Sequence, residues 1–284
     1  MKKKHSHSID NISIPAILYG TAWKEDDTQR LVTQALTLGF KGIDTANQRR
    51  HYFEEGVGLG IQQFLKSSQK TRSDLFLQTK FTSVHGQDNR KPYHEFDSLT
   101  NQVNQSFASS LEHLQTDYID SFVLHGPTLS HGIIDADLEI WQAMEALVLN
   151  GKVKFLGISN VNIEQVKALY KTVLIKPSFI QNRCFAASKW DQDVRLFCEK
   201  NSIIYQGFSL LTANQPYLLN PYMQVLSKQY NKTIPQITFR FARQVGMLPL
   251  TGTTNPQHMT DDLNIDDFEL SSEETQYIEN IVNE

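Results

Sequence analysis

The chain has 284 residues, of which 40% are hydrophobic and 20% are charged, and its formal net charge is −4. This length allows one large α/β domain or two small ones, and it buries enough apolar surface to fold without disulfides or metals. The acidic balance argues against a nucleic-acid binder, which usually carries a strongly basic face. The composition is that of an ordinary enzyme-sized soluble protein.

Short apolar runs alternate with longer amphipathic runs from one end of the chain to the other. Strands are predicted over 14–20, 42–46, 74–81, 118–125, 153–159, 178–184, 203–209 and 247–252. Helices are predicted over 26–40, 53–67, 95–114, 134–150, 162–173, 191–201, 217–230, 233–245, 256–263 and 271–282. Eight strand–helix units without a linker between the halves predict a single-domain (β/α)8 TIM barrel over residues 1–284.

A doubly wound Rossmann fold is the alternative for alternating strands and helices. That fold should carry a G-x-G-x-x-G turn directly after its first strand. The nearest comparable spacing, Gly56–Gly60, lies inside a predicted helix, where glycines indicate close helix packing. The closed barrel is therefore the prediction.

The cysteines and the N-terminal segment bear on the location of the protein. Cys184 and Cys198 provide no disulfide framework and no CxxC metal pattern, so we expect two reduced, mostly buried thiols. Met1–Lys4 resembles the start of a signal peptide, but the apolar core that should follow is missing. No run approaches the roughly 18 apolar residues of a membrane span. We therefore expect a cytoplasmic protein in which residues 1–12 form a flexible segment.

Three predicted strands end on side chains that suit proton transfer. Asp44 lies at the end of the second strand, Lys80 at the end of the third and His125 at the end of the fourth, while Tyr52 lies in the loop after Asp44. Because the strands of a parallel barrel end at one rim, the four side chains should converge. Taken singly, Asp44 could cap a turn, Lys80 could be a solvated charge and His125 could be a buried core histidine. Together they predict a proton-transfer site.

In these segments the chain resembles the aldo-keto reductases. The matching motifs follow one order: Gly20-Thr21-Ala22-Trp23, Gly42–Ala46 with Tyr52 and Glu55, Thr79-Lys80, Asp117–His125, Trp141 with Met144 and Glu145, Gly151-Lys152-Val153, Gly157–Asn160, and Thr233 with Pro235 and Gln236. No single motif is decisive, but their shared order is specific. The resemblance implies NAD(P)H-dependent reduction of aldehydes or ketones to alcohols.

The resemblance also implies a role for each site residue. Tyr52 would be the general acid, with its pKa lowered by the Lys80 ammonium, and Asp44 would hold Lys80 in place. His125 would orient the carbonyl group, in a substrate pocket formed by Trp23, Tyr52 and His125. The cofactor would be NADPH, with NADH as the alternative, and its implied binding residues are Ser159, Asn160, Gln181, Phe208, Ser209, Leu211, Thr251 and His258.

Two departures from the family pattern lie at the substrate side. Tyr52 follows Asp44 by eight positions, where D-x-A-x-x-Y points to Arg49, so we interpret Gln48–His51 as containing a three-residue insertion. The insertion either brings positive charge that favours acidic or phosphorylated substrates, or is a solvated loop. Gly126 stands where many members carry a large Trp, which predicts a wider pocket or one filled by another loop.

Two further departures concern the adenosine end and the C-terminus. Leu250, Thr251 and His258 match positions at which the family often has Lys, Ser or Thr, and Arg, so relaxed cofactor preference is expected. The helix that begins after Asn255 can still offer backbone N–H groups to phosphate. The chain stops at Glu284, before the C-terminal loop of longer members, which predicts an open site with broad specificity for small aldehydes.

Two other functions were weighed against the reductase. His5-Ser6-His7 has the H-x-H spacing of metal-dependent barrel hydrolases, but it follows no strand and lacks an evident acidic partner, so no metal site is predicted. A non-catalytic nicotinamide-binding sensor or regulatory subunit would need Ser159 and Asn160 but not Tyr52. The four proton-handling residues favour an enzyme, with a small carbonyl substrate, no nucleic-acid or membrane partner, and a monomeric state.

Overall fold

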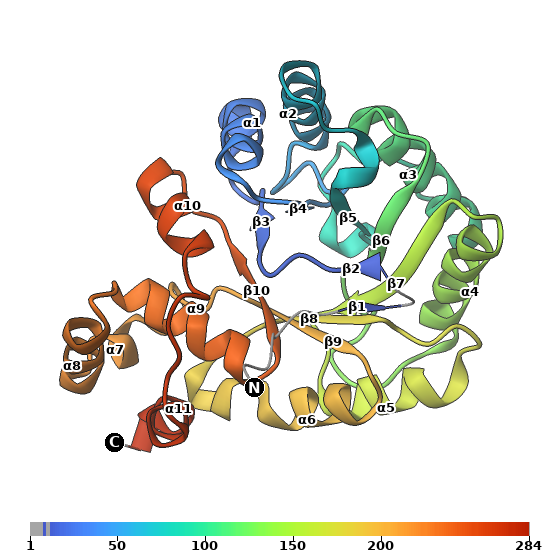
Figure 1. Ribbon diagram of the computed structural model, residues 1–284. Helices are drawn as coiled ribbons and strands as arrows, with labels where there is room; N and C mark the ends of the chain where they lie inside the picture. The colour runs from blue at the N-terminus through green and yellow to red at the C-terminus, as the bar shows by residue number, and fades with distance from the viewer. Residues whose placement is uncertain (1–7, 10–11, 284) are drawn as a thin grey trace.

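Eight parallel strands close into a barrel in the computed structural model, which describes residues 8–9 and 12–283 (Figure 1). The strand order is β10-β3-β4-β5-β6-β7-β8-β9, so consecutive strands are neighbours and β10 closes the ring against β3. Helices surround the barrel on the outside (Figure 1). The predicted (β/α)8 fold is confirmed.

The barrel strands are β3 (Leu18–Gly20), β4 (Gly42–Asp44), β5 (Phe76–Phe81), β6 (Ile119–Leu124), β7 (Val153–Ser159), β8 (Phe179–Arg183), β9 (Ile204–Phe208) and β10 (Met247–Thr251). The helices are α1 (Thr28–Leu38), α2 (Glu54–Ser67), α3 (Leu99–Leu114), α4 (Asp135–Leu149), α5 (Ile163–Thr172), α6 (Gln192–Lys200), α7 (Gln215–Leu218), α8 (Pro221–Tyr230), α9 (Ile234–Gln244), α10 (Pro256–Leu263) and α11 (Ser272–Glu279). Most strands are shorter than predicted, by one or more residues at one or both ends.

Smaller elements complete the chain. Near the N-terminus, β1 (Ser8–Ile9) pairs antiparallel with β2 (Ile12–Ser13). The 3-10 helices are η1 (Glu25–Asp27), η2 (Arg72–Asp74), η3 (Val84–Gly86), η4 (Ala186–Asp191) and η5 (Ile281–Asn283). In the described part of the chain, no helix is both long and apolar enough to cross a membrane. The H-x-H histidines His5 and His7 lie outside the described residues.

One helix prediction was wrong. The single helix predicted over 217–230 is two helices, α7 and α8, which are separated at Asn220. Pro221 lacks the N–H that would continue α7, whereas its fixed φ suits the first position of a new helix. The Asn220 side chain accepts a hydrogen bond from the Tyr222 backbone N–H at 2.8 Å and so begins α8.

The barrel interior is layered because alternate residues of a strand face the same side. Phe76, Phe179 and Ile204 belong to an apolar floor near the amino-terminal ends of β5, β8 and β9. Two positions further along the same strands, Gln78, Gln181 and Gln206 form a buried polar layer. A further step of two reaches Lys80 on β5, Arg183 on β8 and Phe208 on β9. The layering thus places polar groups at one end of the barrel.

The outer core lies between the strands and the helices. It contains large buried side chains, among them Trp141, Phe122 and Phe241. Both cysteines, Cys184 and Cys198, are buried in this core as free thiols, as predicted. The outer core holds the strands rigidly and leaves their carboxyl ends to form a site.

Candidate active site

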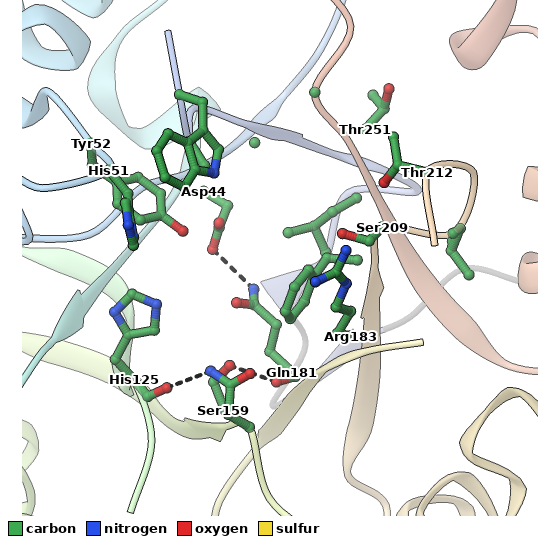
Figure 2. A pocket seen from close by; sticks show the side chains of 18 of the residues that line it. Asp44, His51, Tyr52, His125, Ser159, Gln181, Arg183, Ser209, Thr212 and Thr251 are labelled. Atoms are coloured by element: carbon green, nitrogen blue, oxygen red, sulfur yellow. Dashed lines mark hydrogen bonds between the residues drawn. The ribbon is translucent and has the colours of Figure 1, made fainter. Parts of the chain in front are cut away.

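A cavity of about 1,120 Å³ opens at the carboxyl ends of the barrel strands (Figure 2). With one exception, the side chains predicted for the site line it: Trp23, Asp44, Tyr52, His125, Ser159, Asn160, Gln181, Phe208, Ser209, Leu211, Thr251 and His258. Lys80 is the exception and lies fully buried beneath it. Ligand pockets commonly measure about 300–1,000 Å³. This cavity is therefore large enough for an extended ligand together with a small one.

A buried ion pair lies at the base of the cavity. The Lys80 Nζ donates to both carboxylate oxygens of Asp44 at 2.8 Å and to the Thr45 carbonyl at 2.8 Å. The two side chains are 0% and 5% exposed. Burial lowers the pKa of Lys80, while the Asp44 carboxylate beside it acts in the opposite direction. The ammonium thus has all three of its hydrogens bonded within the protein.

The glutamine layer holds the other side of Asp44. Gln78 and Gln181 both donate to Asp44 Oδ1, at 2.7 and 3.0 Å. Gln181 also donates to Gln206 Oε1 at 2.8 Å, and Gln206 donates to Gln78 Oε1 at 2.9 Å. Both hydrogens of the Gln181 amide are therefore occupied. Its Oε1 remains as an acceptor at the cavity.

A single turn of chain brings Tyr52 to the cavity. The backbone N–H groups of His51 and Tyr52 both donate to the Gln48 carbonyl, at 3.1 and 3.0 Å. This closed turn contains the residues interpreted as an insertion. Figure 2 shows the Tyr52 hydroxyl directed into the open space near His125, and the two rings are 5.9 Å apart between centroids.

The structure differs from the prediction that the Lys80 ammonium lowers the pKa of Tyr52. The Lys80 Nζ lies 5.2 Å from the centroid of the Tyr52 ring, and no hydrogen bond joins it to the Tyr52 hydroxyl. Burial, followed by the nearby Asp44 carboxylate, raises the pKa of Tyr52, which is the opposite of the expected direction. The reason is that Asp44 offsets the Lys80 charge while the ring is removed from water.

His125 is electrically neutral at physiological pH. Burial, the Lys80 ammonium and His51 together lower the pKa of His125 to about 3. Its Nδ1 lies 2.7 Å from the Thr82 hydroxyl oxygen. In the described part of the chain, its Nε2 has no hydrogen-bond partner. An imidazole in this state can offer one nitrogen to a ligand.

Strained backbone accompanies the loops at the rim. Trp23, Asn160 and Ser209 have φ values of 62°, 56° and 57°, in the left-handed region that disfavours side chains. All three residues line the cavity. Such strain concentrates at functional sites, where the surrounding structure holds the backbone in place.

Ser159 and Asn160 also line the cavity, and Figure 2 shows Ser159 beside Gln181. The Ser159 hydroxyl donates to the Gln181 carbonyl at 2.6 Å. The Asn160 amide donates one hydrogen to the His125 carbonyl at 2.7 Å. The second Asn160 N–H and the amide oxygen of Gln181 are left as a donor and an acceptor at the cavity.

Arg183 is a cavity residue that the sequence interpretation missed. It lies next to Phe208 in the β8–β9 ladder, and Figure 2 shows its guanidinium beside Ser209. Among the described cavity-lining residues it is the only Lys or Arg. Its partner within the protein is the Phe185 ring, at 5.4 Å. Alternation along β8 was an available signal, because Arg183 follows Gln181 by two positions.

The end of the cavity near α10 is acidic. The Thr251 hydroxyl donates to Asp262 Oδ2 at 2.7 Å, and burial raises the pKa of Asp262 to about 7. The Asn255 side chain accepts from the backbone N–H groups of Gln257 and His258, so the expected free donors at the start of α10 are already bonded. Asp261 and Asp262 line the cavity at this end, and the Lys24 ammonium lies close by, where it donates to the Gly252 carbonyl.

The two arginines of the interpreted insertion do not line the cavity. Arg49 pairs with Glu25 at 3.4 Å and packs on the Phe53 ring at 4.5 Å. Arg50 is exposed to solvent. His51 does line the cavity, and its ring packs against Trp23 with centroids 4.1 Å apart. The expected positive charge at the mouth is thus directed elsewhere.

The substrate side is open near Gly126. A side-chain carbon added there would meet Asn160 and Ser159 no closer than 3.7 Å, so the site has room for a larger residue. In the described part of the chain, no residue after Asp262 lines the cavity.

No group of three or more potential metal ligands occurs among the described residues.

Comparisons with known proteins give one consistent result. The model of the "Aldo/keto reductase family" matches residues 16–283. An NADPH-dependent alpha-keto amide reductase of Saccharomyces cerevisiae is 30% identical over 93% of this chain and 86% of its own length. A glyoxal reductase of Bacillus subtilis is 29% identical over 87% of this chain and 81% of its own.

Solved structures agree with the sequence comparisons. The crystal structure of a Bombyx mori aldo-keto reductase in complex with NADP is similar to this chain, with 26% identity and a TM-score of 0.81. The match covers 96% of this chain and 90% of the other.

Proposed function

The chain belongs to the aldo/keto reductase family, and from that premise we propose that it reduces aldehydes or ketones to alcohols with NADPH. Tyr52 would be the proton donor. The observation that carries the proposal is that Tyr52 and His125 face one cavity directly above the buried Lys80–Asp44 pair. A hydride donor and a proton donor must meet at one carbonyl group, and this arrangement supplies the proton donor.

The donors and acceptors of the cavity fit a nicotinamide dinucleotide. The Gln181 oxygen and the second Asn160 N–H are complementary to a carboxamide, and the Phe208 ring offers a face for stacking. Arg183 supplies positive charge for a diphosphate. When bound, NADPH supplies the hydride. The yeast relative and the silkworm structure carry NADPH or NADP in their names, which agrees with this assignment.

The proton would move from the Tyr52 hydroxyl to the carbonyl oxygen. The raised pKa of Tyr52 keeps the hydroxyl protonated throughout the physiological range, so the donor is always loaded. The Lys80 ammonium, 5.2 Å from the centroid of the Tyr52 ring, would stabilise the negative charge that develops on the tyrosine. The neutral His125 beside it hydrogen-bonds the same carbonyl oxygen and fixes its position.

Two relatives suggest the first substrates to test. The names alpha-keto amide reductase and glyoxal reductase both denote substrates in which one carbonyl group lies beside another. The open wall at Gly126 leaves room for a substituent. We propose small compounds with adjacent carbonyl groups as the preferred class, over isolated aldehydes.

The test is a Tyr52→Phe variant assayed with phenylglyoxal and an isolated aldehyde. We expect kcat/KM to fall by about 100- to 10,000-fold, the usual contribution of a general acid, while the Kd for NADPH is retained. Tyr170→Phe, which removes a hydroxyl remote from the cavity, is the matched control. Full activity in Tyr52→Phe would exclude Tyr52 as the acid. A wild-type protein that binds NADPH but reduces no carbonyl compound would instead be a sensor.

A further inference from the structure

The end of β5 and the end of β6 bring one more side chain to the proposed proton-transfer site. Phe81 pairs with Leu124, and the His125 N–H donates to the Phe81 carbonyl at 2.9 Å. Thr82 and His125 therefore emerge next to each other at the rim. The Thr82 hydroxyl oxygen lies 2.7 Å from His125 Nδ1.

Thr82 is held firmly in this position. Its side chain is buried, with 5% of the residue exposed. Its backbone carbonyl accepts hydrogen bonds from the Tyr93 hydroxyl at 2.7 Å and from the Gln87 amide at 3.3 Å. The hydroxyl thus approaches the imidazole from a fixed direction.

Either the Thr82 hydroxyl or His125 Nδ1 can be the donor of this hydrogen bond, and only one choice leaves neither group with an unpaired hydrogen. A neutral imidazole carries one N–H, and its other nitrogen is an acceptor. If Nδ1 carried the hydrogen, it would donate to Thr82, and the buried hydroxyl proton would have no acceptor among the described residues. If Thr82 donates to Nδ1 instead, the hydrogen of the ring must lie on Nε2. This nitrogen is the one left without a protein partner at the cavity.

We propose that Thr82 is a positioning residue whose hydroxyl donates to His125 Nδ1 and thereby holds the imidazole in the Nε2–H tautomer. The Nε2–H group then donates to the carbonyl oxygen of the substrate, beside the Tyr52 hydroxyl (Figure 2). In the other tautomer a lone pair of Nε2 would face the lone pairs of that oxygen and repel it. This proposal rests on the proposed reductase function.

The neighbours of the imidazole do not supply an alternative partner. Lys80 and His51 influence it through their charges, Tyr52 through ring contact, and Asn160 through the backbone carbonyl of His125. Among the described residues, Thr82 makes the only side-chain hydrogen bond to the ring. The tautomer therefore depends on one hydroxyl.

Two substitutions test the role of that hydroxyl. Thr82→Val has nearly the same shape but cannot donate, whereas Thr82→Ser keeps the donor. We expect Thr82→Val to lower kcat/KM by about 10- to 100-fold, mainly through kcat, and Thr82→Ser to restore most of it. Thr28→Val is the matched control, since it removes a buried hydroxyl that donates to the Glu25 carbonyl and does not line the cavity.

The tautomer itself is read by nitrogen-15 NMR of histidine-labelled protein without ligands, with His125 assigned from the spectrum of His125→Asn. Wild type and Thr82→Ser should show Nε2–H, and Thr82→Val should shift toward Nδ1–H. An unchanged tautomer in Thr82→Val, or a changed one with normal turnover, overturns the proposal. A wild-type protein without reductase activity would refute the proposed function, while the spectrum would still decide whether Thr82 sets the tautomer.

Discussion

Two clusters at the cavity are built in opposite ways. The proton cluster (Asp44, Tyr52, Lys80, Thr82 and His125) comes from three neighbouring strands and the loops that follow them. Its charged groups are bonded to one another at 2.8 Å or to the glutamine layer. The protein itself therefore satisfies the charged groups of this cluster, Asp44 and Lys80, before any ligand binds.

The rim cluster (Arg183, Ser209, Thr251, His258 and Asp262) comes from β8, β10, the loop after β9 and helix α10. Arg183 and His258 are exposed, and among the described residues the partner of Arg183 is the Phe185 ring. A ligand would supply the missing complement. The difference indicates that the first cluster contributes to stability and rate together, whereas the second contributes to affinity.

The largest effect that would sharpen this comparison is expected from Lys80→Met. Removal of the ammonium leaves the Asp44 carboxylate buried without its ion partner. Breaking a buried pair in this way typically costs about 3–5 kcal/mol of unfolding free energy, and turnover should be lost as well. Urea denaturation and steady-state kinetics measure the two effects.

The double variant Asp44→Asn/Lys80→Met is the control for Lys80→Met. It removes both charges, so it should recover part of the stability while turnover stays lost. A Lys80→Met protein that unfolds at the same urea concentration as wild type would show that the proton cluster does not stabilise the fold.

Arg183→Met should affect affinity alone. A hydrogen bond to a charged group is worth about 1.5–3 kcal/mol, so the Kd for NADPH should rise by roughly tenfold or more. The melting temperature and kcat at saturating cofactor should not change, because Arg183 is exposed and outside the proton cluster. Fluorescence titration of NADPH at low and high salt measures the effect.

Arg30→Met is the matched comparison for Arg183→Met, since Arg30 is also an exposed arginine but pairs with Asp27 on the surface. It should leave the Kd unchanged. Equal Kd values for wild type and Arg183→Met would remove the arginine from the cofactor site and weaken the distinction between the clusters.

The smallest effect is expected from Asp262→Asn, and it depends on pH. Because burial raises the pKa of Asp262 to about 7, its carboxyl is mostly neutral at pH 6 and mostly charged at pH 8. The charged form repels an anionic cofactor, so the wild-type KM for NADPH should rise a few-fold across this range. The KM of Asp262→Asn should not rise in this way. The phosphate of the cofactor also titrates in this pH range, but it affects both proteins equally, so the difference between their KM profiles reports on Asp262 alone.

Stability should follow the same titration. Between about pH 4 and pH 7 the folded state holds the Asp262 proton more tightly than the unfolded state, so the wild-type unfolding free energy falls as pH rises. The melting temperature of Asp262→Asn should decline less over this interval. Parallel pH profiles of the two proteins would mean that Asp262 titrates normally.

The sequence supported the proton cluster better than the rim cluster for a physical reason. Asp44, Lys80 and His125 each end an apolar run, and strand ends of a parallel barrel meet at one rim. Tyr52 required an interpreted insertion, which corresponds to one closed turn. The direction in which the pKa of Tyr52 is shifted could not be predicted, because it depends on the burial of the ring and on the Asp44 charge that offsets Lys80, and both arise only in the folded chain.

Other features were missed because their signals are weak in a sequence. Thr82 and Arg183 each lie two positions beyond a predicted site residue, where strand alternation continues into the rim. The bond between Thr251 and Asp262 joins a strand end to a helix eleven residues later, and no local pattern announces it. The break at Pro221 was visible in the sequence, yet an amphipathic pattern across it suggested one helix.

The glutamine layer also has a consequence for divergence and engineering. Gln78, Gln181 and Gln206 bond mainly to one another and to Asp44, so they separate the apolar floor from the loops above. Gly126 and the turn at Gln48–His51, where the sequence departs from the expected family pattern, lie at the cavity on the other side of that layer. The loops at the cavity can therefore be exchanged to alter substrate specificity, while the hydrophobic core below the glutamine layer stays intact.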